Sequence, residues 1–332
     1  MADVTGAVSR ASSVVGRYFG IVSVLPSFLL VAYLALLVHT GAWSGPPDWP
    51  TAFTALTHLG LGSVALLVFI SFAAGVVLHP LQFAMVQVLE GYWGVGQWTQ
   101  SVRSVLIERH VRRRRALWQL LGFAQTRAAA AADNHAPIPS DDVIHWRSVG
   151  AEADRLVRRY PHEPRLMMPT SLGNMLRRYE VGPGTPFGFN LPATAPLLAL
   201  VAPPEHMKYV NDQRSSFDLA VRACLVSLCA ALATFAFLWD DGLWLLLTLI
   251  PYGAVWLLYR GSVIAAEHYG IALATLMMLN RFEVYDRLHL DQPGNLQEEL
   301  ELNTKIRLIL EEFETPDHMS FRPGDRPRLW RP

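Results

Sequence analysis

The sequence predicts an all-α, polytopic membrane protein with four transmembrane helices and a helical cytoplasmic domain. Of the 332 residues, 52% are hydrophobic and only 17% are charged, and the mean hydropathy is +0.24, on the apolar side of ordinary soluble domains. The apolar residues gather in four long runs, with arginines between and after them. The formal net charge is zero, so overall charge indicates neither a nucleic-acid-binding protein nor an enzyme for acidic substrates.

Each apolar run approaches the length that a helix needs to cross a bilayer. About 20 residues, rising about 1.5 Å each, cover a hydrocarbon core of about 30 Å. Backbone polar groups must be paired inside lipid, so the runs are predicted to be helices rather than loops or open strands. They are Ile21–Val38, Leu59–Leu78, Leu219–Leu238 and Leu243–Leu258, the last with an apolar continuation to Ala266.

Two alternatives would change the number of spans. The first run could be a secretory signal peptide, because Arg10 and Arg17 precede it, although its apolar core is longer than the usual h-region of about 7 to 15 residues. A fifth crossing could use Val263 to Leu279. That crossing would bury Glu267 in lipid and place an arginine-bearing tail outside, against the cost of charge in lipid and the arginine bias.

The arginines predict an orientation with both termini in the cytoplasm. Arg10 and Arg17 precede the first span, whereas the loop from Gly41 to His58 contains no lysine or arginine. The turn Asp240–Gly242 is acidic, and arginines recur in the tail after Arg260. Positive residues favour the cytoplasmic side, so all segments agree on N-in and C-in. The predicted parts are a cytoplasmic N-terminus (1–20), transmembrane helices 1 and 2 (21–84), a cytoplasmic helical domain (85–217), a transmembrane hairpin (218–266) and cytoplasmic C-terminal helices with a tail (267–332).

Several helices are expected outside the membrane. The C-terminal one spaces Leu302, Ile306, Ile309 and Phe313 by four, three and four residues, the pattern of a helix-packing seam. Leu191 to Ala202 is apolar but too short and too rich in proline to span. The predicted helices are 98–132, 142–160, a short helix capped by Thr170 or Ser171, the continuation of the fourth span to 288, and 295–313.

Polar side chains in or near the spans are the candidate functional residues. Burying them in lipid is costly unless they meet partners or water. The alternative is that they mark cytoplasmic helix ends, where long side chains reach the interface. The pore-lining candidates are His79, Gln82, Gln87 and Glu90, and the interface cluster is Asp218, Arg222, Arg260, Glu267 and His268.

A basic run, Arg112, Arg113, Arg114 and Arg115, follows the second span closely enough to reach the membrane face. Anionic lipid would attract each arginine by about 1 kcal/mol, so lipid docking is one interpretation. The other is a topology determinant on a solvated helix. No aromatic interleaving or binding motif accompanies the run, and nucleic acid is not an expected partner.

The motifs of common enzyme and metal sites are missing from the sequence. It contains no HExxH, P-loop, GxGxxG or GxSxG pattern. His162-Glu163 and Glu267-His268 are adjacent pairs, which point in different directions on a helix and make poor shared ligand sets. We therefore expect no catalytic residue, no metal site and no cofactor.

Three short strings carry a family resemblance: LEGYWG at Leu89–Gly94, LGN at Leu172–Asn174 followed by RRYE at Arg177–Glu180, and YRGS at Tyr259–Ser262. They resemble a family of uncharacterised multi-pass membrane proteins of actinobacteria, from the second span to about Leu290. The resemblance implies a bacterial inner membrane and supplies no activity. In the order of its spans the chain also resembles bestrophin channels, but it carries no bestrophin motif, so that is a fold-level analogy alone.

Two functions follow as expectations. The first is an oligomeric membrane pore or ion channel with a cytoplasmic regulatory domain. Four spans in one subunit can hardly enclose water, so a homo-oligomeric ring would form the pore along the second helices. The second is a membrane-anchored interaction or signalling protein, whose cytoplasmic helices dock a protein partner and whose spans serve only as an anchor.

Overall fold

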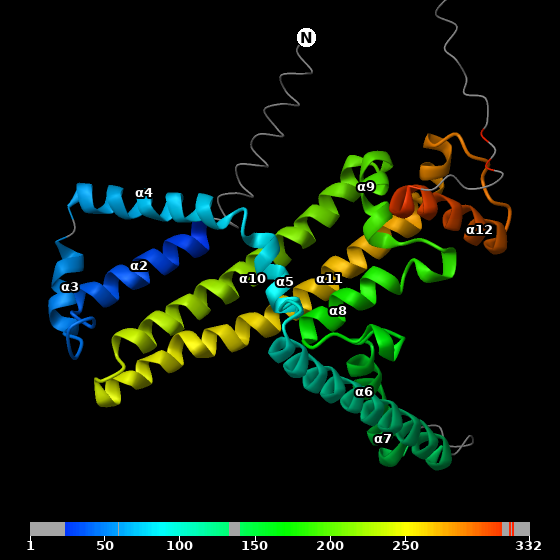
Figure 1. The fold of residues 1–332 in the computed structure, drawn as a ribbon. Coiled ribbons are helices and arrows are strands. Elements are labelled where there is room, and N and C mark those ends of the chain that lie inside the picture. Colours follow the sequence, from blue (N-terminus) through cyan, green and yellow to red (C-terminus); the bar gives the residue numbers. More distant parts are fainter. Residues whose placement is uncertain (1–23, 59, 133–139, 314–318, 320, 322–332) are drawn as a thin grey trace, which may run out of the picture. The chain divides into compact units, whose positions relative to one another are not determined.

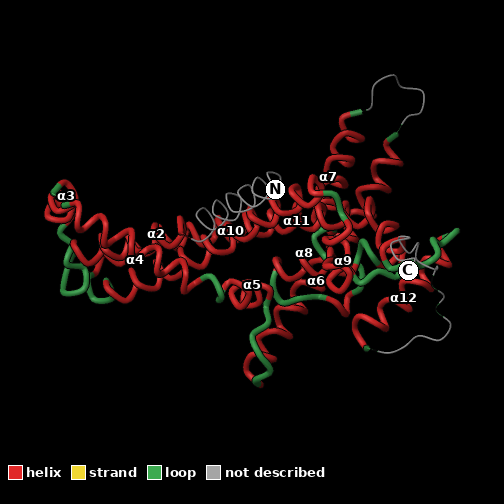
Figure 2. Tube along the Cα trace, turned by 90° about the horizontal axis from the view of Figure 1, so that it is seen from above, coloured by secondary structure: helices red, strands yellow, loops and turns green. Residues whose placement is uncertain are grey.

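The chain is all-helical in the part that the structure describes. The structure is a computed structural model, and it describes residues 24–58, 60–132, 140–313, 319 and 321. These residues form helices and connecting loops, without a strand (Figure 2). A single isolated bridge joins Leu290 to Phe321. The prediction of an all-α fold is confirmed, whereas Arg10, Arg17 and the first residues of the first predicted span lie outside the described residues.

The chain divides into two compact units, and each is described by itself. Residues 1–88 and 212–265 form what we call the membrane unit, and residues 89–211 and 266–332 form the polar unit. Two long helices, α10 (Pro204–Phe237) and α11 (Leu249–Arg287), contribute residues to both. The membrane unit also contains α2 (Leu25–His39), α3 (Trp49–Thr57), α4 (Leu61–Leu78), most of α5 (Gln82–Glu90) and a 3-10 helix (Gly242–Thr248).

Three described helices are long and apolar enough to cross a membrane. They are α4, α10, and the segment Gly242–Arg287 that joins the short 3-10 helix to α11. Large apolar side chains on these helices, such as Phe69 (68% exposed) and Ile250 (69% exposed), are free to contact lipid or other subunits. A membrane-embedded protein is therefore supported. The first predicted span appears as α2, whose 15 described residues fall short of the usual crossing length of about 20.

Proline marks the end of the second predicted span. α4 ends at Leu78, and α5 begins at Gln82 after a break that contains Pro80. Proline lacks a backbone N–H and clashes with the preceding turn, which explains the break at this position. α2 packs beside α4 in the same unit (Figure 1). Leu37, Ala42 and Leu238 form the buried core between α2 and the end of α10.

α11 runs without interruption through the stretch considered for a fifth crossing. Its 39 residues correspond to about 58 Å, far more than a hydrocarbon core of about 30 Å. Val263 to Leu279 therefore continue one helix and do not turn back as a separate span.

The polar unit contains the helices predicted outside the membrane. α6 (Gln97–Ala131) and α7 (Asp141–Val157) pack side by side as a hairpin (Figure 1). α8 (Ser171–Val181) and α9 (Leu191–Val201) follow, and α12 (Leu296–Arg307) leads into a π-helical turn (Leu308–Glu312). Short 3-10 helices occupy Pro164–Leu166 and Thr185–Phe187. The core of this unit is built around Leu198, Met277, Tyr285, Leu290 and Ile306.

The predicted seam of the C-terminal helix is correct only in its first half. Ile306 is 4% exposed and Leu302 packs against the core, but Ile309 is 41% exposed and Phe313 is 90% exposed. The helix changes to a π-helical turn at Leu308, so residues beyond it lose the spacing of the α-helix.

Candidate functional site

The most unusual side chain of the membrane unit is a fully buried arginine. Arg222 lies in the apolar part of α10 with no solvent-exposed surface. Its Nη2 donates a hydrogen bond to the side-chain oxygen of Gln82 on α5. Asp218, one helical turn earlier, is 7% exposed and lies 3.7 Å from the guanidinium of Arg214. The fold thus joins a predicted pore-lining residue, Gln82, to a member of the predicted interface cluster, Arg222.

A buried arginine in an apolar helix requires polar partners, because moving a charge out of water is costly. Hydrogen bonds that involve a charged group are about twice as strong as neutral ones, so the Gln82 oxygen is a suitable partner. Buried hydroxyl groups of the membrane unit differ from Arg222 because they are uncharged and make neutral hydrogen bonds. Ser71 donates to the Leu67 carbonyl at 2.7 Å, and Tyr33 and Thr234 share a hydrogen bond of 2.6 Å.

The four pore-lining candidates do not share one environment. His79 is exposed within the break between α4 and α5, and Gln82 is bound to Arg222. Gln87 is half-buried on α5, and Glu90 is the last residue of that helix and belongs to the polar unit. That these four residues line a pore stays a prediction.

Glu90 joins the polar unit through its backbone. Its carbonyl accepts a hydrogen bond of 2.9 Å from the hydroxyl of Thr170. The same hydroxyl accepts a 2.9 Å bond from the Gly173 N–H, so Thr170, one of the two caps that the sequence offered, is the N-cap of α8. Gly91 has a φ of +103°, and a Cβ there would lie 2.2 Å from Pro169. We call the contact of Glu90 and Gly91 with residues 169–173 the Glu90 joint. It needs a glycine on each side, at Gly91 and at Gly173, because a Cβ at either position would clash.

Asn174 completes the joint from inside α8. The side chain is fully buried, and its Nδ2 donates to the carbonyls of Met168 (2.8 Å) and Thr170 (2.7 Å). Its Oδ1 accepts from the Met168 N–H at 2.9 Å. Sequence reasoning found the LGN string but gave Asn174 no role. Two of the resemblance strings, Leu89–Gly94 and Leu172–Asn174, therefore meet in space at the Glu90 joint.

The Glu90 carboxyl has a pKa close to neutral pH. Burial and, next, the negative charge of Glu180 raise its pKa to about 7, and the opposing effect of Arg177 is smaller. Arg177 is held by an ion pair to Glu180 (3.1 Å) and donates a hydrogen bond to the Tyr92 hydroxyl (2.6 Å). A carboxyl in this environment can accept and release a proton near pH 7.

The remaining members of the predicted interface cluster are Arg260, Glu267 and His268, and their environments differ from that of Arg222. Arg260 is exposed, with its guanidinium 4.6 Å from the centre of the Trp256 ring. Glu267 is half-buried in the polar unit, and its charge adds to the effect of burial in raising the pKa of Tyr179. His268 is exposed.

The basic run is divided by the geometry of its helix. Arg114 is half-buried and donates to the carbonyl of His162 at 2.6 Å. Arg112, Arg113 and Arg115 are exposed, because successive residues point about 100° apart around a helix.

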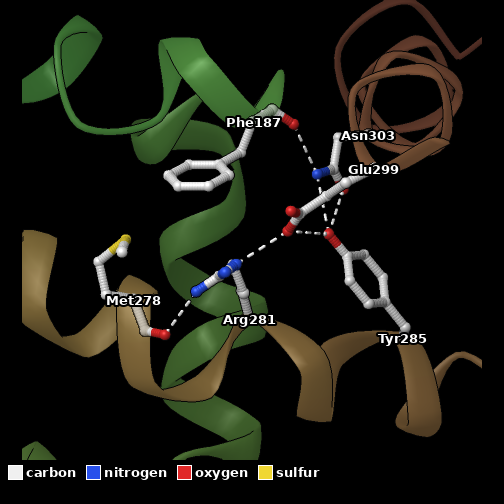
Figure 3. A network of polar contacts seen from close by, with 6 residues as sticks. All are labelled: Phe187, Met278, Arg281, Tyr285, Glu299 and Asn303. Atoms are coloured by element: carbon white, nitrogen blue, oxygen red, sulfur yellow. Dashed lines mark hydrogen bonds and ion pairs between the residues drawn. The ribbon is translucent and has the colours of Figure 1, made fainter. Parts of the chain in front are cut away.

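A buried polar network in the polar unit was not predicted (Figure 3). Glu299 of α12 accepts from Arg281 of α11 at 2.8 Å and from the Tyr285 hydroxyl at 3.2 Å. Asn303 donates to that hydroxyl and to the Phe187 carbonyl, both at 2.8 Å. The four-residue spacing of Glu299 and Asn303 was the available signal, but the sequence does not show that Tyr285 faces them. Each member is bonded to another, which is typical of a structural network.

No group of histidine, cysteine, aspartate or glutamate among the described residues is arranged to hold a metal ion. Comparisons with protein-family models, with curated proteins and with solved structures found no match to this chain.

Proposed function

We propose that the chain assembles into an oligomeric pore or ion channel in a bacterial inner membrane. Each subunit contributes four transmembrane helices, with α2 as the first, and both termini and the polar unit lie on the cytoplasmic side. The polar unit regulates the pore. Gln87 and Glu90 line its cytoplasmic mouth, and His79 lies beside it.

The observation that supports this proposal best is the burial of Arg222 with Gln82. A plain membrane anchor does not need a charge inside its apolar helices, and intramembrane arginines are typical of conduction and coupling sites. The Arg222–Gln82 bond ties α10 to the helix that carries Gln87 and Glu90. It thereby fixes the start of α5, on which the proposed mouth depends.

Assembly is supported by the apolar surfaces of the single subunit. Leu66 and Phe69 on α4 are 58% and 68% exposed, and Leu257 on α11 is 63% exposed. Such side chains need lipid or neighbouring subunits. Native mass spectrometry in lipid nanodiscs is expected to give a ring of four or more subunits. A monomer or dimer leaves no room for a central pore and would refute the proposal.

Conduction itself is tested by ion flux into liposomes that contain the purified chain. The double variant Gln87→Ala with Glu90→Gln is expected to change conductance or selectivity. The matched control is Gln297→Ala with Glu301→Gln, which removes the same chemical groups from an exposed, hydrogen-bonded pair on α12. Unchanged flux in a Gln87/Glu90 variant that still assembles would remove these residues from the pore, and no flux in any bilayer would refute the channel.

The second candidate function is a membrane-anchored interaction or signalling protein. A groove of about 280 Å³ lies between α6 and α7, and Leu121, Ala124, Trp146 and Gly150 are among the residues that line it. An apolar segment of a cytoplasmic protein would fit such a surface. A chain without flux that binds one cytoplasmic protein, and loses it when Gly150 is replaced by Leu, would favour this function.

A further inference from the structure

One face of α6 combines arginines with exposed apolar side chains. Positions three, four and seven residues apart share a side of a helix. On this side Trp98 is 78% exposed, Val105 is 62% exposed and Phe123 is 48% exposed. Three exposed arginines lie between or beyond them on the same side. We call this surface the α6 outer face: Trp98, Val105, Arg109, Arg112, Phe123 and Arg127.

The rest of α6 shows that the outer face is not part of the core. Leu121 and Ala124, on another side of the helix, are buried and lie against Gly150 of α7. Arg114 also points away from the outer face and binds the carbonyl of His162. The packed side of the helix is therefore already occupied. Phe123, near the end of the outer face, also contacts the ring of Trp146 on α7, and its exposed half is left with the rest of the face to a partner outside the polar unit's own core.

The charge of the helix favours an anionic partner. Between Gln97 and Ala131 it carries seven arginines and one acidic residue, Glu108. Glu108 lies 3.7 Å from Arg112, but both side chains are about two-thirds exposed (66% and 67%), so their pairing is weak. Burial, and then the charges of Arg113 and Arg109, lower the pKa of His110, which favours its neutral form.

We propose that the α6 outer face docks on the surface of an anionic lipid bilayer. Arg109, Arg112 and Arg127 bind lipid phosphates, and Trp98, Val105 and Phe123 insert among the headgroups. Helices that combine a basic surface with aromatic and aliphatic side chains bind in this way at membrane interfaces. The apolar side chains distinguish this surface from a purely electrostatic one, because they gain from contact with hydrocarbon.

The position of α6 in the sequence supports the same occupant. Only residues 79–96 separate its first residue from the last residue of α4, a candidate membrane-spanning helix. The bilayer is therefore held at a high effective concentration near α6, whatever the function of the membrane unit. This proposal does not depend on the existence of a pore.

The test places a nitroxide spin label on the outer face and measures its depth. Ala116 is exposed and falls on the same side of α6 as Arg109 and Arg112, so it is changed to cysteine in the full chain, with Cys224→Ala and Cys229→Ser. The chain is placed in nanodiscs of zwitterionic lipid alone or with about one-third anionic lipid. The relative accessibility of the label to oxygen and to a water-soluble nickel chelate reports whether it lies in the bilayer or in water.

Docking predicts an interfacial depth in anionic nanodiscs, an aqueous environment in zwitterionic ones, and release from the anionic bilayer at high salt. Each arginine near an anionic surface favours attachment roughly fivefold. The double variant Arg109→Gln with Arg112→Gln should therefore lower the equilibrium constant for docking by about 25-fold. The matched control is Arg155→Gln with Arg158→Gln. Arg155 is an exposed arginine of α7, and Arg158 is the exposed residue directly after it. Each is paired with an acidic residue of α7, and the control should leave the label depth unchanged.

Three results would overturn the proposal. One is an aqueous label in both bilayers, and another is an equal depth in both, which would remove the role of charge. The third is a label that remains aqueous beside lipid but is immobilised by an added oligonucleotide, which would assign the face to nucleic acid. The comparison of two lipid compositions uses the same protein, so it remains decisive even if an arginine variant fails to fold.

Discussion

Gly173 lies directly against the backbone carbonyl of Glu90, and a methyl group on Gly173 would be 2.2 Å from that oxygen. The contact brings the end of α5 against the first turn of α8, at a point where Thr170 also bonds the same carbonyl. No side chain other than hydrogen fits between the two backbones. The Glu90 joint therefore depends on a glycine in a helix, where glycine is otherwise unfavourable.

Gly173→Ala is expected to destabilise the protein by about 1–3 kcal/mol, because the backbone must move to admit the methyl group. Gly122→Ala is the matched control, since a Cβ at that exposed position of α6 meets no described atom within 4 Å. The control should be neutral or stabilising by up to about 1 kcal/mol. Thermal unfolding in nanodiscs measures both, and equal stability of the two variants would contradict the close contact.

Glu90 is expected to make the stability of the protein depend on pH. Its pKa rises from an ordinary value of 4.5 to about 7 in the folded chain. Between these pH values the folded chain keeps a proton that the unfolded chain has released, so stability falls as pH rises through this window. A pKa rise of this size corresponds to about 3 kcal/mol, and solvent screening of the partly exposed carboxyl reduces this to roughly 1–2 kcal/mol.

The measurement is thermal unfolding at a series of pH values between about 4 and 8. Glu90→Gln should flatten the decline in stability, because the amide does not ionise. Glu180→Gln should lower the upper end of the window, since the Glu180 charge raises the pKa of Glu90. Glu283→Gln changes an exposed carboxyl of α11 and serves as the control. An unaltered pH profile in Glu90→Gln would show that another group carries the dependence.

Tyr285→Phe is expected to cost about 1–3 kcal/mol, because it removes a hydroxyl that Glu299 and Asn303 both contact in a buried site. Tyr209→Phe removes a hydroxyl from a 48% exposed side chain and should have little effect. Chemical unfolding of the two variants under the same conditions provides the comparison. If both lose the same stability, the network contributes nothing beyond a general tyrosine effect.

Much of the helical framework could be predicted, because it depends on local signals. The apolar run at α4 and the alanine-rich end of α6 determine helices through composition alone. Thr170 was identifiable as a cap because capping needs only a side-chain oxygen three residues before a free N–H. Phe313 was misplaced because the switch to a π-helical turn at Leu308 depends on tertiary packing.

The contacts of the candidate site could not be predicted in the same way. Gln82 and Arg222 are 140 residues apart, and neither sequence neighbourhood indicates the other as partner. Asn174 looks like an ordinary polar residue of a short helix until its three bonds to the preceding loop are seen. Tyr285 lies in a long helix whose polar side is not evident from periodicity, since α11 is apolar around much of its surface.

The Arg222–Gln82 bond should show strong energetic coupling in a double-mutant cycle. The single variants are Arg222→Met and Gln82→Leu, and the expected coupling is about 1.5–3 kcal/mol, the range of hydrogen bonds to a charged group. The comparison pair is Tyr33→Phe with Thr234→Val, which removes a neutral hydrogen bond within the same unit and should couple by about 0.5–1.5 kcal/mol. Gln82→Leu should lower the free energy of unfolding more than Tyr33→Phe does, because it leaves the buried charge of Arg222 with one partner fewer. Coupling no larger than that of the neutral pair would mean that Arg222 is stabilised mainly by other groups, and the position of α5 would then not depend on this bond.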